Sequence, residues 1–228
     1  ATKGIERGSG LRMSELLGEE LGTGDDMVAL SGPNLSREIA AGQPAVSVAA
    51  CAREDQARQA QELLSTSLFR VYRNSDIMGV ELCGALKNVI AIGAGISDGM
   101  GFGTNVRSAL VTRGLAEMTR LGVAAGARSE TFAGVAGMGD LLTTCTSKLS
   151  RNHTFGMRLA AGETREEIEA STPSVAEGIW TTVAEVEMAQ RLAMEAPIAE
   201  AVHAGLFDGA DPRDAAVYLM TREQRAEY

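Results

Sequence analysis

A lysine inside a largely apolar segment is the first residue whose chemistry stands out. Lys87 lies in the stretch ELCGALKNVIAIGAG, whose apolar positions recur with helical spacing. Burial lowers the pKa of a lysine, and an amine with a pKa near neutrality can exchange a proton with a reacting oxygen. The next residue, Asn88, can orient a polar ligand. An exposed lysine on a narrow polar stripe of the helix fits the local sequence equally well.

A second candidate is the polar run Ser150, Arg151 and Asn152, at the start of a predicted helix. Arginine binds phosphate through paired hydrogen bonds, and the free N–H groups of a helix N-terminus add to such a site. The run could therefore clamp an anion. Taken alone, it favours a plainer interpretation, in which Ser150 caps the helix and Arg151 is exposed.

Asp140 is the third candidate, because glycines bracket it and hydroxyl residues follow it closely. The segment GVAGMGDLLTTCTS contains Thr143, Thr144, Thr146 and Ser147. Loops of this kind commonly carry ligand sites, since their backbone and hydroxyl groups are accessible. A helix-capping aspartate explains the same pattern, and both interpretations stay open at this point.

A serine hydrolase is the enzyme class that one further motif suggests. The segment Gly95–Gly99 matches G-x-S-x-G through Ser97, and Asp140 and His153 follow in the chain order that such enzymes use. That turn has to follow a strand and open a helix, whereas here a helical pattern precedes it. The motif is therefore a weak argument for hydrolysis.

The elements that must position these residues fall into two parts. In the first part, strands are expected at Met27–Leu30, Ala45–Cys51 and Phe69–Tyr72, and helices at Ser36–Ala41 and Glu54–Leu64. A strand, a helix and a strand at this spacing predict a βαβ unit and a parallel sheet. Three strands are too few for a complete doubly wound sheet, so we expect the chain to begin within a domain.

From residue 76 on, the pattern is helical. Asp76 is expected to cap a long helix, a glycine-rich loop to follow over Gly93–Gly103, and Asn105 to cap a helix that ends at Gly122. Arg113 and Glu117, one turn apart, are expected to pair. Residues 132–150 are expected to be rich in loops, with helices after them at Arg151–Ala161, Arg165–Glu169, Val175–Met194, Pro197–Ala204 and after Asp211-Pro212.

Composition excludes several classes of function. The chain has 228 residues, a formal net charge of -9 and 4% aromatic residues, so it lacks the basic stripe and stacking surfaces of a nucleic-acid-binding protein. No long uncharged apolar run predicts a membrane span, and the start lacks an apolar signal core. Three scattered cysteines and two histidines fit neither a disulfide framework nor a zinc site, so we expect a cytoplasmic protein without a metal.

Several segments together resemble the NAD(P)-dependent glycerol-3-phosphate dehydrogenases of the bacterial type. The matching segments are TKGIE (2–6), SGPN (31–34), DIMGVELCGALKNVIAIGAGISDGMGFGTN (76–105), TRGLAEM (112–118), TFAGVAGMGDLLTTCTSKLSRNHTFG (131–156), VAEG (175–178) and API (196–198). The two longest are highly specific. One family thus accounts for all three candidate sites at once.

The resemblance implies a fold in two domains. Residues 1–75 would be the C-terminal part of an NAD(P)-binding domain, an α/β remnant of a doubly wound, Rossmann-type sheet. Residues 76–228 would be an all-α substrate domain like the C-terminal domain of 6-phosphogluconate dehydrogenase. The strand and the G-x-G-x-x-[GA] loop that open such a dinucleotide-binding half do not precede Ala1, so we expect most of that half to be missing.

The same resemblance implies the role of each candidate residue. The catalytic residues would be Lys87 as general acid and base, Lys3 and Asp140. The substrate would be bound by Lys3, Gly32, Asn34, Lys87, Asn88, Asp140, Thr144, Ser150, Arg151 and Asn152. The cofactor would be bound by Lys3, Ser36, Arg151, Val175 and Glu177.

The activity implied is the reversible reduction of dihydroxyacetone phosphate to sn-glycerol 3-phosphate for glycerophospholipid synthesis. The cofactor would be NADP or NAD, and the protein would be a cytoplasmic homodimer that binds no nucleic acid. A different hypothesis is a non-catalytic fragment of that enzyme, which retains only phosphate-anion binding and oligomer contacts.

Overall fold

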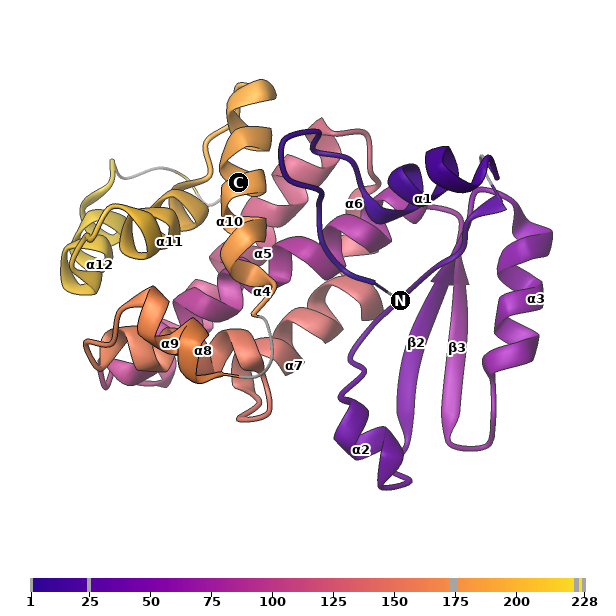
Figure 1. Cartoon of the computed structure of the whole chain (residues 1–228), viewed down its shortest axis with the longest axis horizontal. Coiled ribbons are helices and arrows are strands. Elements are labelled where there is room, and N and C mark those ends of the chain that lie inside the picture. The colour runs from indigo at the N-terminus through magenta and orange to yellow at the C-terminus, as the bar shows by residue number, and fades with distance from the viewer. Residues whose placement is uncertain (1, 24–25, 173–175, 224–225, 227–228) are drawn as a thin grey trace.

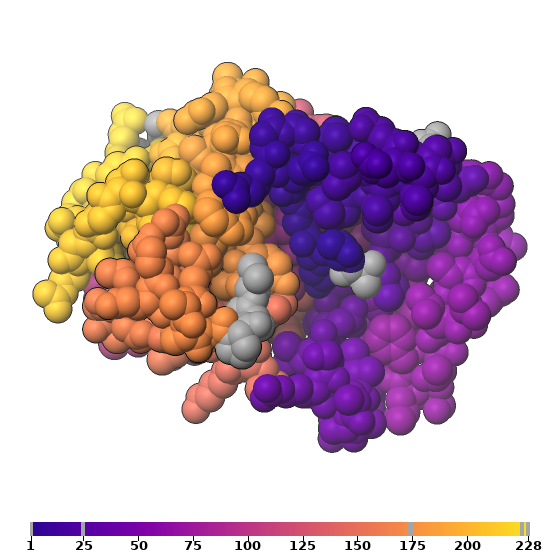
Figure 2. Space-filling view, viewed as in Figure 1, coloured from indigo at the N-terminus to yellow at the C-terminus, as the bar shows by residue number. Residues whose placement is uncertain are grey.

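The computed structural model describes residues 2–23, 26–172, 176–223 and 226. A small sheet lies at one end of the molecule, and helices grouped around one central helix make up the rest (Figure 1). This architecture confirms the predicted fold class, an α/β portion followed by a mostly helical portion. On the surface, the N-terminal residues lie against the helical portion (Figure 2).

The sheet contains three strands, in the order β1 (Ala29–Ser31), β2 (Ala45–Ala50) and β3 (Phe69–Asn74). β2 and β3 are parallel, and α3 (Glu54–Leu64) connects them. The predicted βαβ unit is therefore confirmed.

β1 runs antiparallel to β2, so the prediction of a wholly parallel sheet is wrong. The connection between these strands contains only α2 (Ser36–Ala40), a helix of 5 residues. Such a helix spans about 7.5 Å, whereas a six-residue strand spans about 20 Å. A connection this short cannot carry the chain back along the sheet, and an antiparallel pair does not require that return.

The central helix, α4 (Ile77–Gly99), is buried on most sides. Asp76 caps it as predicted, because its Oδ1 accepts a hydrogen bond from the N–H of Gly79 at 2.9 Å. The other helices are α1 (Met13–Leu21), which the sequence patterns did not predict, α5 (Thr104–Ala124), α6 (Ser129–Phe132), α7 (Asp140–Thr146), α8 (Arg151–Ala160), α9 (Arg165–Ser171), α10 (Gly178–Arg191), α11 (Pro197–Phe207) and α12 (Pro212–Thr221).

The glycine-rich loop expected over Gly93–Gly103 is wrong, because α4 continues to Gly99. Glycines in this part of α4 face α8 at very close range. A Cβ on Gly95 would overlap the carbonyl oxygen of His153, and a Cβ on Gly99 would lie 2.9 Å from that of Met157. These glycines let two helix backbones touch, and they do not mark turns.

The loop-rich segment expected over 132–150 is also largely wrong. A π-helical turn at Val135–Gly139 leads directly into α7. The small and hydroxyl residues of this segment are accommodated in helical structure, since the hydroxyl of Thr143 bonds to the carbonyl oxygen of Gly139 one turn earlier.

Glu117 does not pair with Arg113 as expected. Its side chain is 1% exposed and accepts hydrogen bonds from the backbone N–H groups of Ile198 and Ala199, at the start of α11. The carboxylate therefore satisfies the free donors of a neighbouring helix N-terminus instead of a charge on its own helix.

Among the described residues, α4 is long and apolar enough to cross a membrane by length and composition. Its most apolar window is 78% buried inside the protein, as in the core helix of a soluble domain. The length of α4 is thus only weak evidence for a membrane span.

Candidate active site

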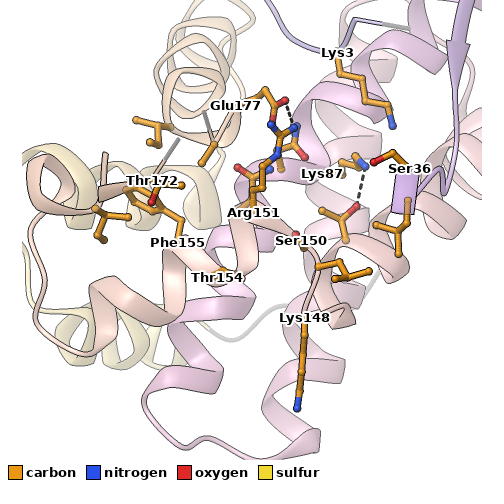
Figure 3. Close-up of a pocket in the computed structure, with 18 of the residues that line it drawn as sticks. Lys3, Ser36, Lys87, Lys148, Ser150, Arg151, Thr154, Phe155, Thr172 and Glu177 are labelled. Carbon is orange, nitrogen blue, oxygen red and sulfur yellow. Dashed lines mark hydrogen bonds and ion pairs between the residues drawn. The ribbon is translucent and has the colours of Figure 1, made fainter. Parts of the chain in front are cut away.

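A cleft of about 890 Å³ opens between the sheet and the helical portion. Its walls come from the N-terminal arm, the loop between β1 and α2, and the helices α4, α8, α9 and α10 (Figure 3). Ten of the predicted site residues line it: Lys3, Asn34, Ser36, Lys87, Asn88, Thr144, Ser150, Arg151, Asn152 and Glu177. Residues far apart in sequence thus converge on one cavity.

Lys87 lies at the floor of this cleft and is 6% exposed. Its Nζ donates hydrogen bonds to Oδ1 of Asp140 at 2.5 Å and to Oγ1 of Thr144 at 2.8 Å. The interpretation of Lys87 as an exposed surface lysine is therefore wrong. Arg151 lines the same cleft, so the amine and the guanidinium face a common space.

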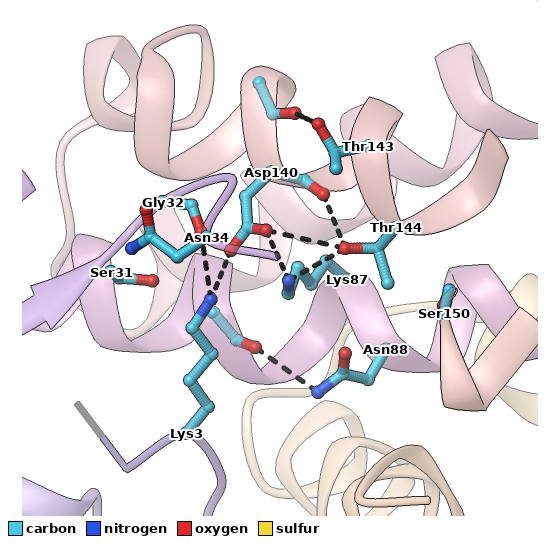
Figure 4. Close-up of polar contacts among 12 residues, drawn as sticks. Lys3, Ser31, Gly32, Asn34, Lys87, Asn88, Asp140, Thr143, Thr144 and Ser150 are labelled. Atoms are coloured by element: carbon cyan, nitrogen blue, oxygen red, sulfur yellow. Dashed lines mark hydrogen bonds and ion pairs between the residues drawn. The ribbon is translucent and has the colours of Figure 1, made fainter. Parts of the chain in front are cut away.

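Asp140 holds two ammonium groups at once (Figure 4). Its Oδ2 accepts a hydrogen bond from Nζ of Lys3 at 2.5 Å, while Oδ1 binds Lys87. Lys3 also donates to the carbonyl oxygen of Gly32 at 3.3 Å. Asp140 is the first residue of α7 and is 2% exposed, so its carboxylate serves the lysines and is not a helix cap. Two positive charges share one negative charge, and the cluster carries a net positive charge.

The pKa of Lys87 is lowered from 10.5 to about 8. Burial is the largest cause, because it disfavours the charged amine, and the neighbouring charge of Lys3 acts in the same direction. Asp140 opposes both effects. The result is an amine that is mostly protonated at neutral pH and can lose its proton within the physiological range.

Thr144 and Asn88 fix the surroundings of the amine. The hydroxyl of Thr144 donates to the backbone oxygen of Asp140 at 2.6 Å, so its lone pair is directed at Lys87. Asn88 is 4% exposed and donates through Nδ2 to the carbonyl oxygen of Gly84 at 3.4 Å. Both side chains are held in place before any ligand arrives.

Gly32 and Asn34 approach the cluster from the end of β1. Gly32 has a φ of +146°, a conformation that favours glycine, and its carbonyl oxygen contacts Lys3. Asn34 donates through Nδ2 to the hydroxyl of Ser47 at 2.9 Å. Its buried Oδ1 has no hydrogen-bond partner among the described residues.

The three side chains of the run Ser150, Arg151 and Asn152 make different contacts. The hydroxyl of Ser150 accepts a hydrogen bond from the N–H of His153 and so caps α8. Asn152 accepts one from the N–H of Gly178 at 2.9 Å, which joins α8 to α10. The side chain of Arg151 is 48% exposed and forms an ion pair with Glu177 at 2.5 Å.

Two further predicted cofactor contacts, Ser36 and Glu177, line the cleft. Ser36 is exposed at the start of α2, and Glu177 precedes α10. Val175 lies outside the described residues. Three further cations line the cleft that the sequence patterns did not single out, namely Arg37, Lys148 and Arg158. No spacing in the sequence distinguishes them from ordinary surface residues, and Lys148 points away from Lys87 (Figure 3).

The serine hydrolase interpretation finds no support in the geometry. Ser97 lies inside α4, 6% exposed, and its hydroxyl has no hydrogen-bond partner among the described residues. His153 contacts Asp98 instead, at 2.8 Å. No nucleophile is activated there.

Comparisons with known proteins agree on one family. The family profile described as NAD-dependent glycerol-3-phosphate dehydrogenase C-terminus matches residues 76–217, and the corresponding N-terminus profile matches residues 1–57. The chain is 52% identical over 229 residues to the glycerol-3-phosphate dehydrogenase [NAD(P)+] of Geobacter sp. strain M21, which covers 100% of this chain and 68% of that protein.

Two more relatives give the same result. The glycerol-3-phosphate dehydrogenase [NAD(P)+] of Thermobifida fusca is 50% identical over 226 residues, which are 99% of this chain and 67% of that protein. The crystal structure of glycerol-3-phosphate dehydrogenase from Coxiella burnetii matches with a TM-score of 0.91 and 40% identity, over 97% of this chain and 68% of that one.

Proposed function

The chain belongs to the NAD(P)-dependent glycerol-3-phosphate dehydrogenase family, whose members are oxidoreductases that use NAD or NADP, and we propose that Lys87 is the general acid and base of this reaction. The reaction is the reversible reduction of dihydroxyacetone phosphate to sn-glycerol 3-phosphate. The observation that carries the proposal is the buried contact of Lys87 Nζ with Asp140 and Thr144 at the floor of the cleft.

The proton has a defined donor in this arrangement. A bound nicotinamide cofactor supplies the hydride that reduces the carbonyl carbon. Lys87 donates its proton to the carbonyl oxygen as negative charge develops there, and in the reverse direction it takes the hydroxyl proton. A pKa of about 8 suits both directions, because the amine is charged at neutral pH yet releases its proton readily.

Lys3 and Asp140 assist this transfer without exchanging the proton themselves. The ammonium of Lys3 stabilises the developing negative charge on the same oxygen, which is the role of a preorganised cation. Asp140 holds Lys3 and Lys87 side by side at 2.5 Å each, against their mutual repulsion. Asn88 and Thr144 fix the direction of the amine.

Arg151 is the proposed anchor for the substrate phosphate. Its half-exposed guanidinium can turn from Glu177 to a phosphate and bind it through two hydrogen bonds. Ser150 and Asn152 keep donors unused by their structural contacts, namely the hydroxyl hydrogen and the amide NH₂. Gly32 and Asn34 face the other end of the substrate, where Oδ1 of Asn34 can accept a hydroxyl.

The cleft fits a nicotinamide cofactor as well as a substrate. Its volume of about 890 Å³ lies at the upper end of the range for small-molecule sites, which leaves room for a nicotinamide ring beside a triose phosphate. We propose that Lys3, Ser36, Arg151, Val175 and Glu177 hold the cofactor. The positive cluster and the arginine suit its negative charge.

The experiment that tests this function follows absorbance at 340 nm with dihydroxyacetone phosphate and either NADH or NADPH. The proposal predicts oxidation of the cofactor that depends on the substrate, and dihydroxyacetone without its phosphate serves as the matched control. Equal rates with and without the phosphate would contradict the role of Arg151. No substrate-dependent oxidation with either cofactor would contradict the activity.

A second proposal concerns the 228 residues taken alone, which span about two thirds of the length of the relatives. The described sheet has three strands, and the sequence contains no G-x-G-x-x-[GA] loop after a strand. In this proposal, the polypeptide retains only phosphate-anion binding and oligomer contacts. Calorimetry separates the two proposals: micromolar NADPH binding supports the enzyme, and binding of glycerol 3-phosphate without NADPH binding supports the fragment.

We also propose a domain division at residue 75, a homodimer, and a cytoplasmic role in supplying sn-glycerol 3-phosphate for phospholipid synthesis. The division is supported by the change from sheet to helices between β3 and α4. The dimer is supported by the exposed apolar residues Val217 and Met220 of α12. The three cysteines are buried, and so few scattered cysteines suit a reducing compartment.

A further inference from the structure

The N-terminal arm, residues 2–12, connects the active site to the outer side of α10. In Figure 1 this indigo segment passes beside α10, and in Figure 2 its surface lies against the orange helices. One end of the arm carries Lys3, whose ammonium contacts Asp140 in the cleft. The position of this cation therefore depends in part on the contacts that the rest of the arm makes.

The residues that follow Lys3 connect it to the contacts that hold the arm. Gly4, between Lys3 and Ile5, has a φ of +143°, a conformation that favours glycine. Ile5 is partly buried against the helical core. Beyond it, Arg7 is exposed at the surface and reaches over α10.

The contact of the arm with α10 is a stacked cation. The guanidinium of Arg7 lies 3.8 Å from the centre of the Trp180 ring, and that of Arg165, from α9, lies 5.8 Å from it. Trp180 is partly buried, with its ring 5.9 Å from that of Phe207. The aromatic face of Trp180 is thus presented to an exposed arginine, which is the geometry of a cation–π contact.

We propose that Trp180 is a positioning residue, which holds Arg7 and thereby keeps the ammonium of Lys3 on Asp140 beside Lys87. The effect on catalysis rests on the proposed function, whereas the positioning of Lys3 by Trp180 does not. A cation–π contact at an exposed site shifts the equilibrium between the released arm and the arm held on Trp180 toward the held state by about two- to fivefold. Loss of the contact lets Lys3 leave Asp140 for part of the time.

The expected consequence of releasing Lys3 is a change in the pKa of Lys87. The charged groups that face it are Asp140 of α7 and Lys3 of the arm, and the thiol of Cys145 lies close enough to sense its charge. Burial is the main reason that its pKa is low, and the charge of Lys3 lowers it further. When Lys3 moves away, the pKa of Lys87 rises. Greater exposure of the amine to water would also raise it, so the test needs a control variant that loosens the packing but leaves Lys3 in place.

The sequence makes this effect measurable, because the chain contains only three lysines, Lys3, Lys87 and Lys148. Lysine labelled with ¹³C at Cε gives three NMR signals, which substitutions assign and a pH titration follows. Exposed Lys148 is the internal reference. Lys3→Met defines the largest upward shift of the Lys87 midpoint that loss of this neighbour can produce.

Four variants complete the test. Arg7→Ala and Trp180→Ala are expected to raise the Lys87 midpoint by part of the Lys3→Met shift, and Trp180→Phe, which keeps an aromatic face, by less. Trp180→Ala changes no charge, so it separates release of the arm from loss of the arginine charge. Met188→Ala, a core truncation on the same helix, is the matched control and leaves the midpoint unchanged.

The result that overturns the proposal is an unchanged Lys87 midpoint in Trp180→Ala and Arg7→Ala, whether or not Lys3→Met moves it. If Trp180→Ala does not fold, Arg7→Ala and Trp180→Phe still decide, because Arg7 is exposed and phenylalanine preserves most of the packing. The titration requires no turnover, so a failure of the proposed function would appear separately, in the assay at 340 nm.

Discussion

The buried amine of Lys87 makes the stability of the protein depend on pH in a way that a substitution can expose. A fall of its pKa from 10.5 to about 8 means that the folded state disfavours the charged amine. This fall corresponds to about 3 kcal/mol. Lys87→Met removes the titrating group and keeps a side chain of similar length.

The sign of the effect follows from proton binding. Between pH 8 and pH 10.5 the unfolded chain keeps the proton on Lys87, and the folded protein has lost it. Stability rises with pH wherever the unfolded state binds more protons. The penalty for the charged amine is therefore fully present below pH 8 and is relieved above it. As the pH rises to 10.5, the free energy of unfolding of the wild type should increase by about 3 kcal/mol relative to that of Lys87→Met.

Urea unfolding at pH 7, 8, 9 and 10 measures this difference, with the fluorescence of the single tryptophan, Trp180, as the probe. Lys148→Met, at an exposed position, is the matched control and should give a difference without pH dependence. A difference between the wild type and Lys87→Met that stays flat from pH 7 to pH 10 would refute the reasoning. A difference that falls with pH would show that the pKa is raised, as for a lysine whose ion pair outweighs its burial.

Three other substitutions follow from the same structure. Arg151→Lys is expected to raise the KM for dihydroxyacetone phosphate about tenfold or more with a smaller effect on kcat, because lysine cannot bind phosphate in two parallel bonds; an unchanged KM would count against it. Glu185→Leu is expected to stabilise the protein by about 1–3 kcal/mol at pH 7.5, because this carboxyl is 0% exposed and lacks a hydrogen-bond partner among the described residues. Burial raises the pKa of Glu185 and the charge of Glu117 adds to it, so the advantage grows as the pH rises above 4.5, and a loss of stability at pH 7.5 would contradict it. Gly95→Ala is expected to destabilise by about 1–3 kcal/mol in urea, because its Cβ would overlap the backbone of α8; Gly205→Ala, which meets open space in α11, is the control, and an equal effect of both would contradict the packing argument.

Much of the fold was predictable because periodicity and caps reflect local physics. The bounds of α3 follow from its apolar spacing, and Asp76 caps α4 as its residue type suggests. The error at Gly93–Gly103 has a different origin. Glycine is favoured both where a chain turns and where two helices touch, and only the position of α8 distinguishes these cases.

The candidate site was predictable in part for similar reasons. The apolar neighbours of Lys87 indicated burial, but they could not exclude a polar stripe, because this depends on which face meets α7. Asp140 resembled a helix cap, and only its distance of 2.5 Å from each lysine shows another use. The pair of Arg7 and Trp180 had no sequence signal, since the residues are far apart and each is common on a surface.

The turnover number of Lys87→Met tests the central claim most directly, measured at 340 nm with saturating dihydroxyacetone phosphate. Removal of a general acid and base costs about 10²- to 10⁴-fold in rate, so kcat should fall by at least a hundredfold while KM changes only a few-fold. A kcat within a few-fold of the wild type would show that the proton comes from another group.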